Sequence, residues 1–201
     1  MDTNTLPYIE NVNFLHNNLM TTIFTPTYNR AGFLMPLYDS IKKQSSRDFE
    51  WVIVDDGSTD NTYEVIADII SSHDDSFPIK YFKKPNGGKH TAINMGVNVA
   101  EGELFLILDS DDELPPNAIE TIEKRYKKIK TDESIGGVCG YMAHRNGDRI
   151  GKPVIETVAS SLELRYKHNI TGDMCEVFRT AVLKEYPFPE ISGEKFCPEA
   201  L

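Results

Sequence analysis

A fourfold alternation of short apolar runs with segments of helical period is the feature that most constrains how this chain can fold. The apolar runs occupy residues 22–24, 51–54, 79–82 and 104–108, and apolar residues recur at helical spacing after each run. Run 51–54 contains no polar residue, which is typical of a strand covered on both faces. Strands that alternate with helices build a mostly parallel sheet with helices on both faces. The pattern therefore predicts an α/β fold over residues 20–130.

Two helix starts can be proposed from residue type. Asp60 or Asn61 is expected to cap the helix after run 51–54, because both side chains accept hydrogen bonds from backbone N–H groups. Pro36 is expected in the first turn of the helix after run 22–24, where its missing N–H does no harm.

The remainder of the chain, residues 131–201, has a less regular pattern. It predicts a strand over 136–141, a hairpin turn at Asn146-Gly147 and a short helix over 160–167. We therefore divide the chain into an N-terminal extension (1–19), an α/β half (20–130) and a smaller second half (131–201).

Charge and cysteine content exclude several classes of protein. With 31 acidic and 21 basic residues the net charge is −10, which argues against a nucleic acid as partner. No apolar run approaches the roughly 20 residues of a membrane-spanning helix, and the acidic N-terminus does not resemble a secretory signal. The three cysteines are widely spaced, which favours a reduced, cytoplasmic location and no catalytic thiol.

Acidic residues follow two of the predicted strands directly. Asp55-Asp56 ends run 51–54, and Asp109-Ser110-Asp111-Asp112 ends run 104–108. Parallel strands present their carboxyl ends at one edge of a sheet, so these five aspartates are expected to lie near one another. Their repulsion must be compensated by a cation or by hydrogen-bond donors, and carboxylate oxygens suit Mg2+ or Mn2+. Taken singly, either group could also be an ordinary turn or helix cap.

A glycine-rich stretch follows the third run. Gly87-Gly88-Lys89 lacks the spacing of a P-loop, and it follows the wrong strand for a dinucleotide fingerprint. A glycine pair, a lysine and a helix N-terminus together suit a phosphate, although a plain turn with a solvated lysine has the same composition. Beside an acidic metal site, Lys89 becomes a candidate partner for a diphosphate.

Six motifs between residues 20 and 115 together resemble the start of a family 2 glycosyltransferase, and the last is similar to that family's D-x-D element. In chain order they are Phe24-Thr25-Pro26-Thr27-Tyr28-Asn29-Arg30, Val52-Ile53-Val54-Asp55-Asp56-Gly57-Ser58-Thr59-Asp60, Asn86-Gly87-Gly88-Lys89, Ala92-Ile93-Asn94-Met95-Gly96, Ala100-Glu101-Gly102-Glu103 and Leu106-Ile107-Leu108-Asp109-Ser110-Asp111-Asp112.

The resemblance implies a GT-A fold, with a Rossmann-like central sheet for the donor and a smaller irregular region on the acceptor side. It also implies a hexosyl- or N-acetylhexosaminyltransferase that inverts the anomeric centre and depends on Mn2+ or Mg2+. The expected donor is a nucleotide-diphosphate sugar, with UDP as the nucleotide, and the expected acceptor is a glycan or a lipid-linked molecule. Such enzymes build cell-surface polysaccharides, so peripheral association with the inner face of the membrane is expected.

Site roles are transferred from the family by position. The Thr25–Tyr28 backbone and Asp56 or Asp55 would recognise the base, Lys89 would lie near the ribose or phosphates, and Asp109 near the ribose. The candidate metal ligands are Asp111, Asp112 and Asp109. The full set of candidate donor-binding residues is Thr25, Pro26, Thr27, Tyr28, Arg30, Asp55, Asp56, Lys89, Asn94, Asp109, Ser110 and Asp111.

An inverting displacement also needs a general base for the acceptor hydroxyl. Segment 188–199 resembles the acidic motif of the family, with Pro198-Glu199 in place of the usual E-D pair. Glu199 is therefore the first candidate base and Glu194 the second, although solvated loop carboxylates would have the same pattern. Gly172 and Asp173 are candidates for the border of the acceptor pocket.

Two alternative functions remain from the sequence. Family catalytic domains usually continue past the acidic motif, so we expect this chain to be truncated, and it could then be a nucleotide-sugar-binding fragment without turnover. The other alternative is a receiver-type phospho-acceptor signalling domain, which also gathers aspartates around Mg2+. In those domains the acidic pair follows the first strand, whereas Asp55-Asp56 follows the second.

Overall fold

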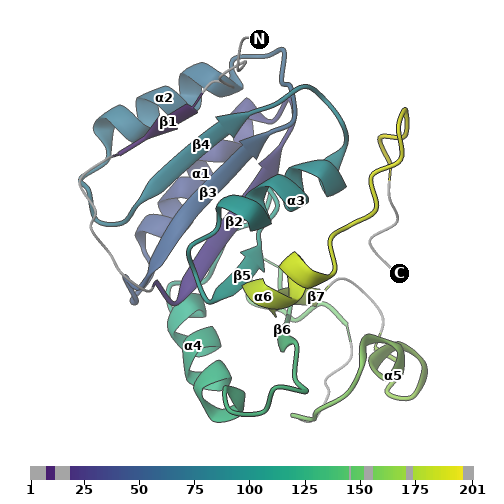
Figure 1. Ribbon diagram of the computed structural model, residues 1–201. Helices are drawn as coiled ribbons and strands as arrows, with labels where there is room; N and C mark the ends of the chain where they lie inside the picture. The colour runs from purple at the N-terminus through teal and green to yellow at the C-terminus, as the bar shows by residue number, and fades with distance from the viewer. Residues whose placement is uncertain (1–7, 12–18, 145, 152–155, 171–173, 197–201) are drawn as a thin grey trace.

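A seven-stranded, mostly parallel sheet with helices on both faces forms the centre of the molecule, as predicted (Figure 1). The computed structural model describes residues 8–11, 19–144, 146–151, 156–170 and 174–196. The strand order is β1-β4-β3-β2-β5-β7-β6. The strands are β1 (Tyr8–Glu10), β2 (Thr21–Thr27), β3 (Phe49–Asp55), β4 (Ile79–Lys83), β5 (Leu104–Ile107), β6 (Gly137–Tyr141) and β7 (Met174–Arg179).

The four predicted apolar runs are the parallel core of this sheet, β4-β3-β2-β5. All seven residues of β2 and of β3 are buried, which explains why these strands have no polar alternation. The chain reverses its direction of winding between β2 and β5, and the crevice for a ligand in such sheets lies beyond the strand ends at this switch. The fold thus selects one edge of the sheet as the place to look for a site.

Helices cover the two faces of the sheet in separate apolar clusters. Helices α1 (Ala31–Lys42), α2 (Thr62–Ser72) and α4 (Ala118–Ile129) pack on one face, and α3 (Lys89–Val99) and α6 (Thr180–Glu185) pack on the other. Gly96 lets α3 approach the sheet closely, because a Cβ there would lie 2.1 Å from the ring of Phe24. The shared core fixes α3, and with it the glycine-rich stretch before it, against β2.

The placement of Pro36 in a first helical turn is wrong. Helix α1 begins at Ala31, so Pro36 lies inside the helix, in its second turn. The start is set by a contact that is distant in sequence, because the Asp60 carboxylate accepts a hydrogen bond from the Ala31 N–H at 3.2 Å. The preference of proline for the first turn of a helix does not report a hydrogen bond between Ala31 and Asp60.

The second half contains the predicted elements and two that were not predicted. The strand expected over 136–141 is β6, and the short helix is α5 (Ser161–Tyr166), begun by a capping box between Ser160 and Glu163. The hairpin turn is present: Gly147 has a φ of 89°, and Ala143 and Arg149 form an antiparallel bridge. Strand β7 and helix α6 have no clear period in the sequence. Within the described residues, none of the helices has the length and apolar character needed to cross a lipid bilayer.

A buried histidine on the α1–α2 side predicts how the stability of the fold depends on pH. His73 Nδ1 lies 2.8 Å from the Tyr38 hydroxyl and Nε2 lies 3.0 Å from the Phe77 carbonyl oxygen. Since the carbonyl can only accept, Nε2 carries the proton and Nδ1 accepts from Tyr38. Burial lowers the pKa of His73 below its ordinary 6.5, against a smaller raising effect of the Phe77 bond and of Asp74.

We therefore expect stability to fall as the pH falls from about 6.5, because the unfolded chain then binds a proton that the folded chain does not. In urea denaturation, the unfolding free energy of His73→Gln should decrease less between pH 7 and pH 5 than that of the wild type. The difference should be up to about 1.4 kcal/mol per pH unit. The exposed His144 provides the control: His144→Gln should retain the wild-type slope. Equal slopes for all three proteins would contradict this role of His73.

Candidate active site

Sequence-distant loops meet at the carboxyl edge of the parallel strands. The register pairs Thr27 of β2 with Asp55 of β3, and Asp55 with Lys83 of β4. On the other side, Phe24 of β2 pairs with Ile107 of β5, and the Leu108 N–H donates to the Phe24 carbonyl at 2.8 Å. The acidic residues after β3 and after β5 therefore flank the end of β2, as predicted.

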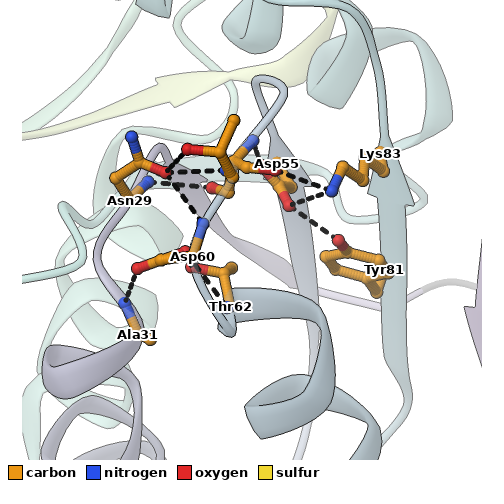
Figure 2. Close-up of polar contacts among 9 residues, drawn as sticks. Asn29, Ala31, Asp55, Asp60, Thr62, Tyr81 and Lys83 are labelled. Atoms are coloured by element: carbon orange, nitrogen blue, oxygen red, sulfur yellow. Dashed lines mark hydrogen bonds and ion pairs between the residues drawn. The ribbon is translucent and has the colours of Figure 1, made fainter.

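The loops after β2 and β3 are joined by two polar side chains, shown in Figure 2. The Asn29 side-chain oxygen accepts from the Thr59 N–H at 2.8 Å, and the backbone N–H of Asn29 donates to the Ser58 hydroxyl at 2.8 Å. Asn29 has a φ of 53°, a left-handed conformation that asparagine tolerates better than most residues. Asp60 accepts from the N–H groups of Ala31 and Thr62, at the starts of two helices. Burial acts to raise the pKa of Asp60, but the hydrogen bond from the Thr62 hydroxyl and those from the two N–H groups together lower it.

Asp55 is completely buried and is compensated by hydrogen-bond donors of the protein (Figure 2). Its Oδ1 accepts from the Ser58 N–H at 2.7 Å and its Oδ2 from the Tyr81 hydroxyl at 2.8 Å. Lys83 Nζ lies 3.8 Å from Oδ2. Burial, and then the bond to Asp55, raises the pKa of Tyr81 well above its ordinary value, so the hydroxyl stays a donor. Asp55 thus shapes the turn after β3.

Asp56 holds the glycine-rich loop. Its Oδ1 accepts from the Gly87 N–H at 2.9 Å and its Oδ2 from the Gly88 N–H at 2.7 Å. Lys84 Nζ lies 2.5 Å from Oδ1 and also donates to the Thr91 hydroxyl at 2.6 Å. Sequence reasoning missed Lys84; a basic residue immediately after a strand and facing an acidic turn is the signal that could have found it. The repulsion among the aspartates can be compensated by a cation or by hydrogen-bond donors. For Asp55 and Asp56 the compensation comes from hydrogen-bond donors of the protein itself.

The carboxylates after β5 are paired with cations from two other loops. Lys89 Nζ, at the start of α3, lies 2.9 Å from each oxygen of Asp109. Arg30 Nη1, in the loop after β2, lies 3.2 Å from Asp111 Oδ2, and both side chains are about half exposed. The structure thus brings four of the predicted site residues into two ion pairs that connect three strand ends. An anionic group can interact with the lysine and arginine at the same place where a cation can interact with the aspartates.

The carboxylates after β5 also fit a divalent metal. Asp109 Oδ1 is buried, and among the described residues its polar contact is the ion pair with Lys89, so it is an oxygen that a metal ion could share with that lysine. Among the residues that the structure describes, no three of the His, Cys, Asp and Glu side chains are grouped closely enough to hold a metal by themselves. Magnesium-type sites in phosphate-handling enzymes commonly use only one or two carboxylates, and substrate phosphates and water complete the shell. Asp109 and Asp111 would supply such a pair.

The other candidate donor-binding residues differ in their freedom to contact a ligand. Thr25 is engaged inside the sheet, where its hydroxyl accepts from the Trp51 indole N–H at 3.0 Å. Pro26 and Ser110 are buried at the strand ends, and Tyr28 is 47% exposed. At the end of β2 the Thr27 hydroxyl is buried and has no hydrogen-bond partner among the residues that the structure describes. It is therefore a better candidate than Thr25 for a polar contact to a ligand.

The residues predicted for the acceptor side are only partly described. Glu194 is exposed in the segment after α6. Asn94, a candidate for donor binding, contacts this segment: its side-chain N–H donates to the Phe188 carbonyl at 2.8 Å. Glu199, Gly172 and Asp173 lie outside the described residues. Asp112 forms a turn in which its N–H donates to the Asp109 carbonyl at 3.0 Å.

The described cysteines are poor candidates for a nucleophile, in agreement with their spacing. Desolvation by the packing around each sulfur raises the pKa of Cys139, which is exposed as a residue, to about 11 and that of the more enclosed Cys175 to about 12, so both thiols stay protonated near neutral pH. In the β6–β7 register Cys139 is opposite Glu176 and Cys175 is opposite Gly140. The two thiols therefore point to opposite faces of the sheet.

Sequence comparison assigns this arrangement to a family. The sequence model described as glycosyl transferase family 2 matches residues 22–186. The chain is 37% identical over 132 residues to a chondroitin synthase of Pasteurella multocida (strain Pm70), covering 66% of this chain and 13% of that protein. It is 35% identical over 122 residues to glycosyltransferase GlyG of Streptococcus pneumoniae serotype 4, covering 61% of this chain and 40% of GlyG. The chain thus matches well under half the length of these relatives.

Solved structures confirm the GT-A fold. TarS of S. aureus, residues 1–349 in complex with UDP, superimposes with a TM-score of 0.64 at 24% identity, over 85% of this chain and 50% of that one. The mannosyltransferase PcManGT of Pyrobaculum calidifontis, in complex with GDP-Man and Mn2+, gives a TM-score of 0.61 at 23% identity, over 85% and 47% of the two chains.

Proposed function

Because this chain belongs to glycosyltransferase family 2, we propose that it binds a nucleotide-diphosphate sugar at the carboxyl edge of its sheet and transfers the sugar to a glycan or lipid-linked acceptor. The proposal is supported mainly by two ion pairs at the switch in strand order, Lys89–Asp109 and Arg30–Asp111. They place two cations and two carboxylates where a diphosphate and its counter-ion would both be recognised.

We propose UDP as the nucleotide and Mn2+ or Mg2+ as the ion. Two proteins of the same fold support this choice: TarS has been solved with UDP and with UDP-GlcNAc, and PcManGT with GDP-Man and Mn2+. A divalent ion held by Asp109 and Asp111, with Asp112 as a third candidate, would neutralise the charge on the departing nucleotide. Lys89 would donate to the diphosphate, and the unpartnered Thr27 hydroxyl to the nucleoside.

The transfer itself is a single in-line displacement in this proposal. The acceptor hydroxyl oxygen forms a bond to the anomeric carbon as the bond from that carbon to the diphosphate oxygen breaks, which inverts the centre. The hydroxyl proton passes to a carboxylate, for which Glu199 is the first candidate and Glu194 the second. A contact supports Glu194: the carbonyl of its neighbour, Lys195, lies against Gly88 of the glycine-rich loop.

Substitution of the candidate base separates binding from transfer. Glu199→Gln should leave the affinity for the donor unchanged and reduce kcat by about 100-fold or more, because the amide cannot take the proton. Single-turnover transfer and a parallel donor titration measure the two quantities. Glu194→Gln is the matched variant: if it loses transfer and Glu199→Gln retains it, the base is Glu194.

The alternative, a nucleotide-sugar binder without turnover, makes a different prediction for the chain of 201 residues. Release of UDP from UDP-sugars is assayed with this chain and, in parallel, with a longer one that extends past residue 201. We expect release by the chain of 201 residues that increases with acceptor. Binding without release by this chain, together with release by the longer one, would favour the binder and would overturn our proposal for residues 1–201.

A further inference from the structure

Asn94 connects helix α3 to the segment that follows α6. Its side-chain N–H donates to the Phe188 carbonyl at 2.8 Å, and its side-chain oxygen accepts from the Phe188 N–H at 2.9 Å. The same amide nitrogen also donates to Glu190 Oε1 at 2.8 Å. One asparagine therefore satisfies both backbone groups of a residue 94 positions away and orients a carboxylate two residues further on. The Phe188 ring packs against the apolar cluster on this face of the sheet.

A second contact holds the same segment at the start of α3. A Cβ on Gly88 would lie 2.1 Å from the carbonyl oxygen of Lys195, so the backbone of the segment reaches the glycine-rich loop. In Figure 1 the chain after α6, drawn in yellow, runs upward beside α3. The segment is thus fixed in the middle of α3 by Asn94 and at the beginning of α3 by Gly88.

These two contacts determine where the acidic residues of the segment lie. Glu190 is bonded to Asn94, and Glu194 is one residue before the contact with Gly88. Gly88 is also the residue whose N–H is bound by Asp56, and Lys89 follows it to pair with Asp109. The docked segment therefore passes directly beside the loop that we propose for the diphosphate.

We infer that Asn94 is a positioning residue, which docks segment 188–195 on α3 and so holds Glu194, the second candidate for the general base, beside the donor site. The inference rests on the proposed function for its catalytic part. Its structural part, the docking, stands on the contacts of Asn94 and Gly88 alone.

Hydrogen–deuterium exchange of the chain of 201 residues tests the docking directly. Asn94→Ala removes three hydrogen bonds to the segment, so the amides of 188–195, and that of Phe188 first, should exchange at least about tenfold faster. Exchange in β2 and β3 should be unchanged. Asn98→Ala is the matched control, because Asn98 is an exposed asparagine of the same helix, one turn further on. Gly88→Ala is a second variant, which should loosen the segment from its other end.

Kinetics tests the positioning role. In Asn94→Ala we expect kcat for transfer to fall about tenfold or more, whereas the Kd for UDP with Mn2+ stays within about twofold of the control. Exchange of 188–195 equal to that in Asn98→Ala would overturn the docking. Faster exchange with an unchanged kcat would overturn the positioning role. If the wild-type chain transfers nothing, the proposed function fails, and the exchange comparison by itself still supports or overturns the docking.

Discussion

Asp111→Asn is expected to abolish the increase in melting temperature that UDP with Mn2+ produces in the wild-type protein. The substitution removes the charge from one of the two carboxylates that fit the ion, and neutral amides are weak ligands for Mn2+ and Mg2+. We expect the affinity for UDP in the presence of Mn2+ to fall by about 100-fold or more and transfer to become undetectable. Thermal shift and calorimetric titration measure the change.

The same variant should fold as well as the wild type. Asp111 is 47% exposed and its partner Arg30 45% exposed, and exposed ion pairs contribute about 1 kcal/mol at most. Asp148→Asn, an exposed aspartate of the turn at Asn146-Gly147, is the control and should retain the full thermal shift. A wild-type response to UDP and Mn2+ in Asp111→Asn would remove this residue from the metal site.

Asp56→Ala is expected to destabilise the protein by about 3 to 5 kcal/mol, which is the range for removing one partner of a buried charged pair. The substitution leaves the N–H groups of Gly87 and Gly88 without their acceptor and leaves Lys84, largely buried, without its carboxylate. Urea denaturation at pH 7 measures the loss. Donor binding should weaken as well, because the glycine-rich loop is no longer held.

A second pair of variants separates the structural role of Asp56 from a role as a ligand contact only. Asp56→Asn keeps one oxygen acceptor but directs an NH2 group at N–H donors, so it should also destabilise the protein. The exposed Asp68→Ala, on α2, should change the unfolding free energy by less than about 0.5 kcal/mol. Loss of donor affinity without loss of stability in Asp56→Ala would show that the carboxylate faces the ligand instead of the loop.

The parallel half of the fold could be predicted because burial on both faces imposes continuous apolar runs. Strands β2 and β3 are buried at every position, and the sequence shows this as the apolar pair Ile23-Phe24 and the apolar run Trp51–Val54. Strand β7 is only partly buried and contains Glu176 and Arg179, so its residues have no clear alternation. Strand β1 has three residues at the sheet edge, and α6 has six residues, which is too short for a helical period to show.

The site was predictable as a set of residues but not as a set of bonds. Its acidic residues stand directly after buried strands, so the topology by itself brings them to one edge. Their partners are separated from them in sequence: Lys84 lies 28 positions from Asp56, and Phe188 lies 94 positions from Asn94. A local pattern can mark Lys84 as a basic residue directly after a strand, but it does not identify Asp56 as the partner, and nothing local connects Asn94 with Phe188. Asp55 and Asp56, which we expect near the base of the donor, also fix the turn after β3 and the glycine-rich loop through bonds of this kind.

Calorimetric titration of the chain with UDP, once with Mn2+ and once with a chelator, tests the central claim most directly. The claim is that the carboxyl edge binds a nucleotide diphosphate through Lys89, Asp109 and Asp111 together with a divalent ion. We predict binding of one UDP per chain with Mn2+ and at least about tenfold weaker binding with the chelator. Absence of binding by UDP, by GDP and by their sugar conjugates in both conditions would contradict the account.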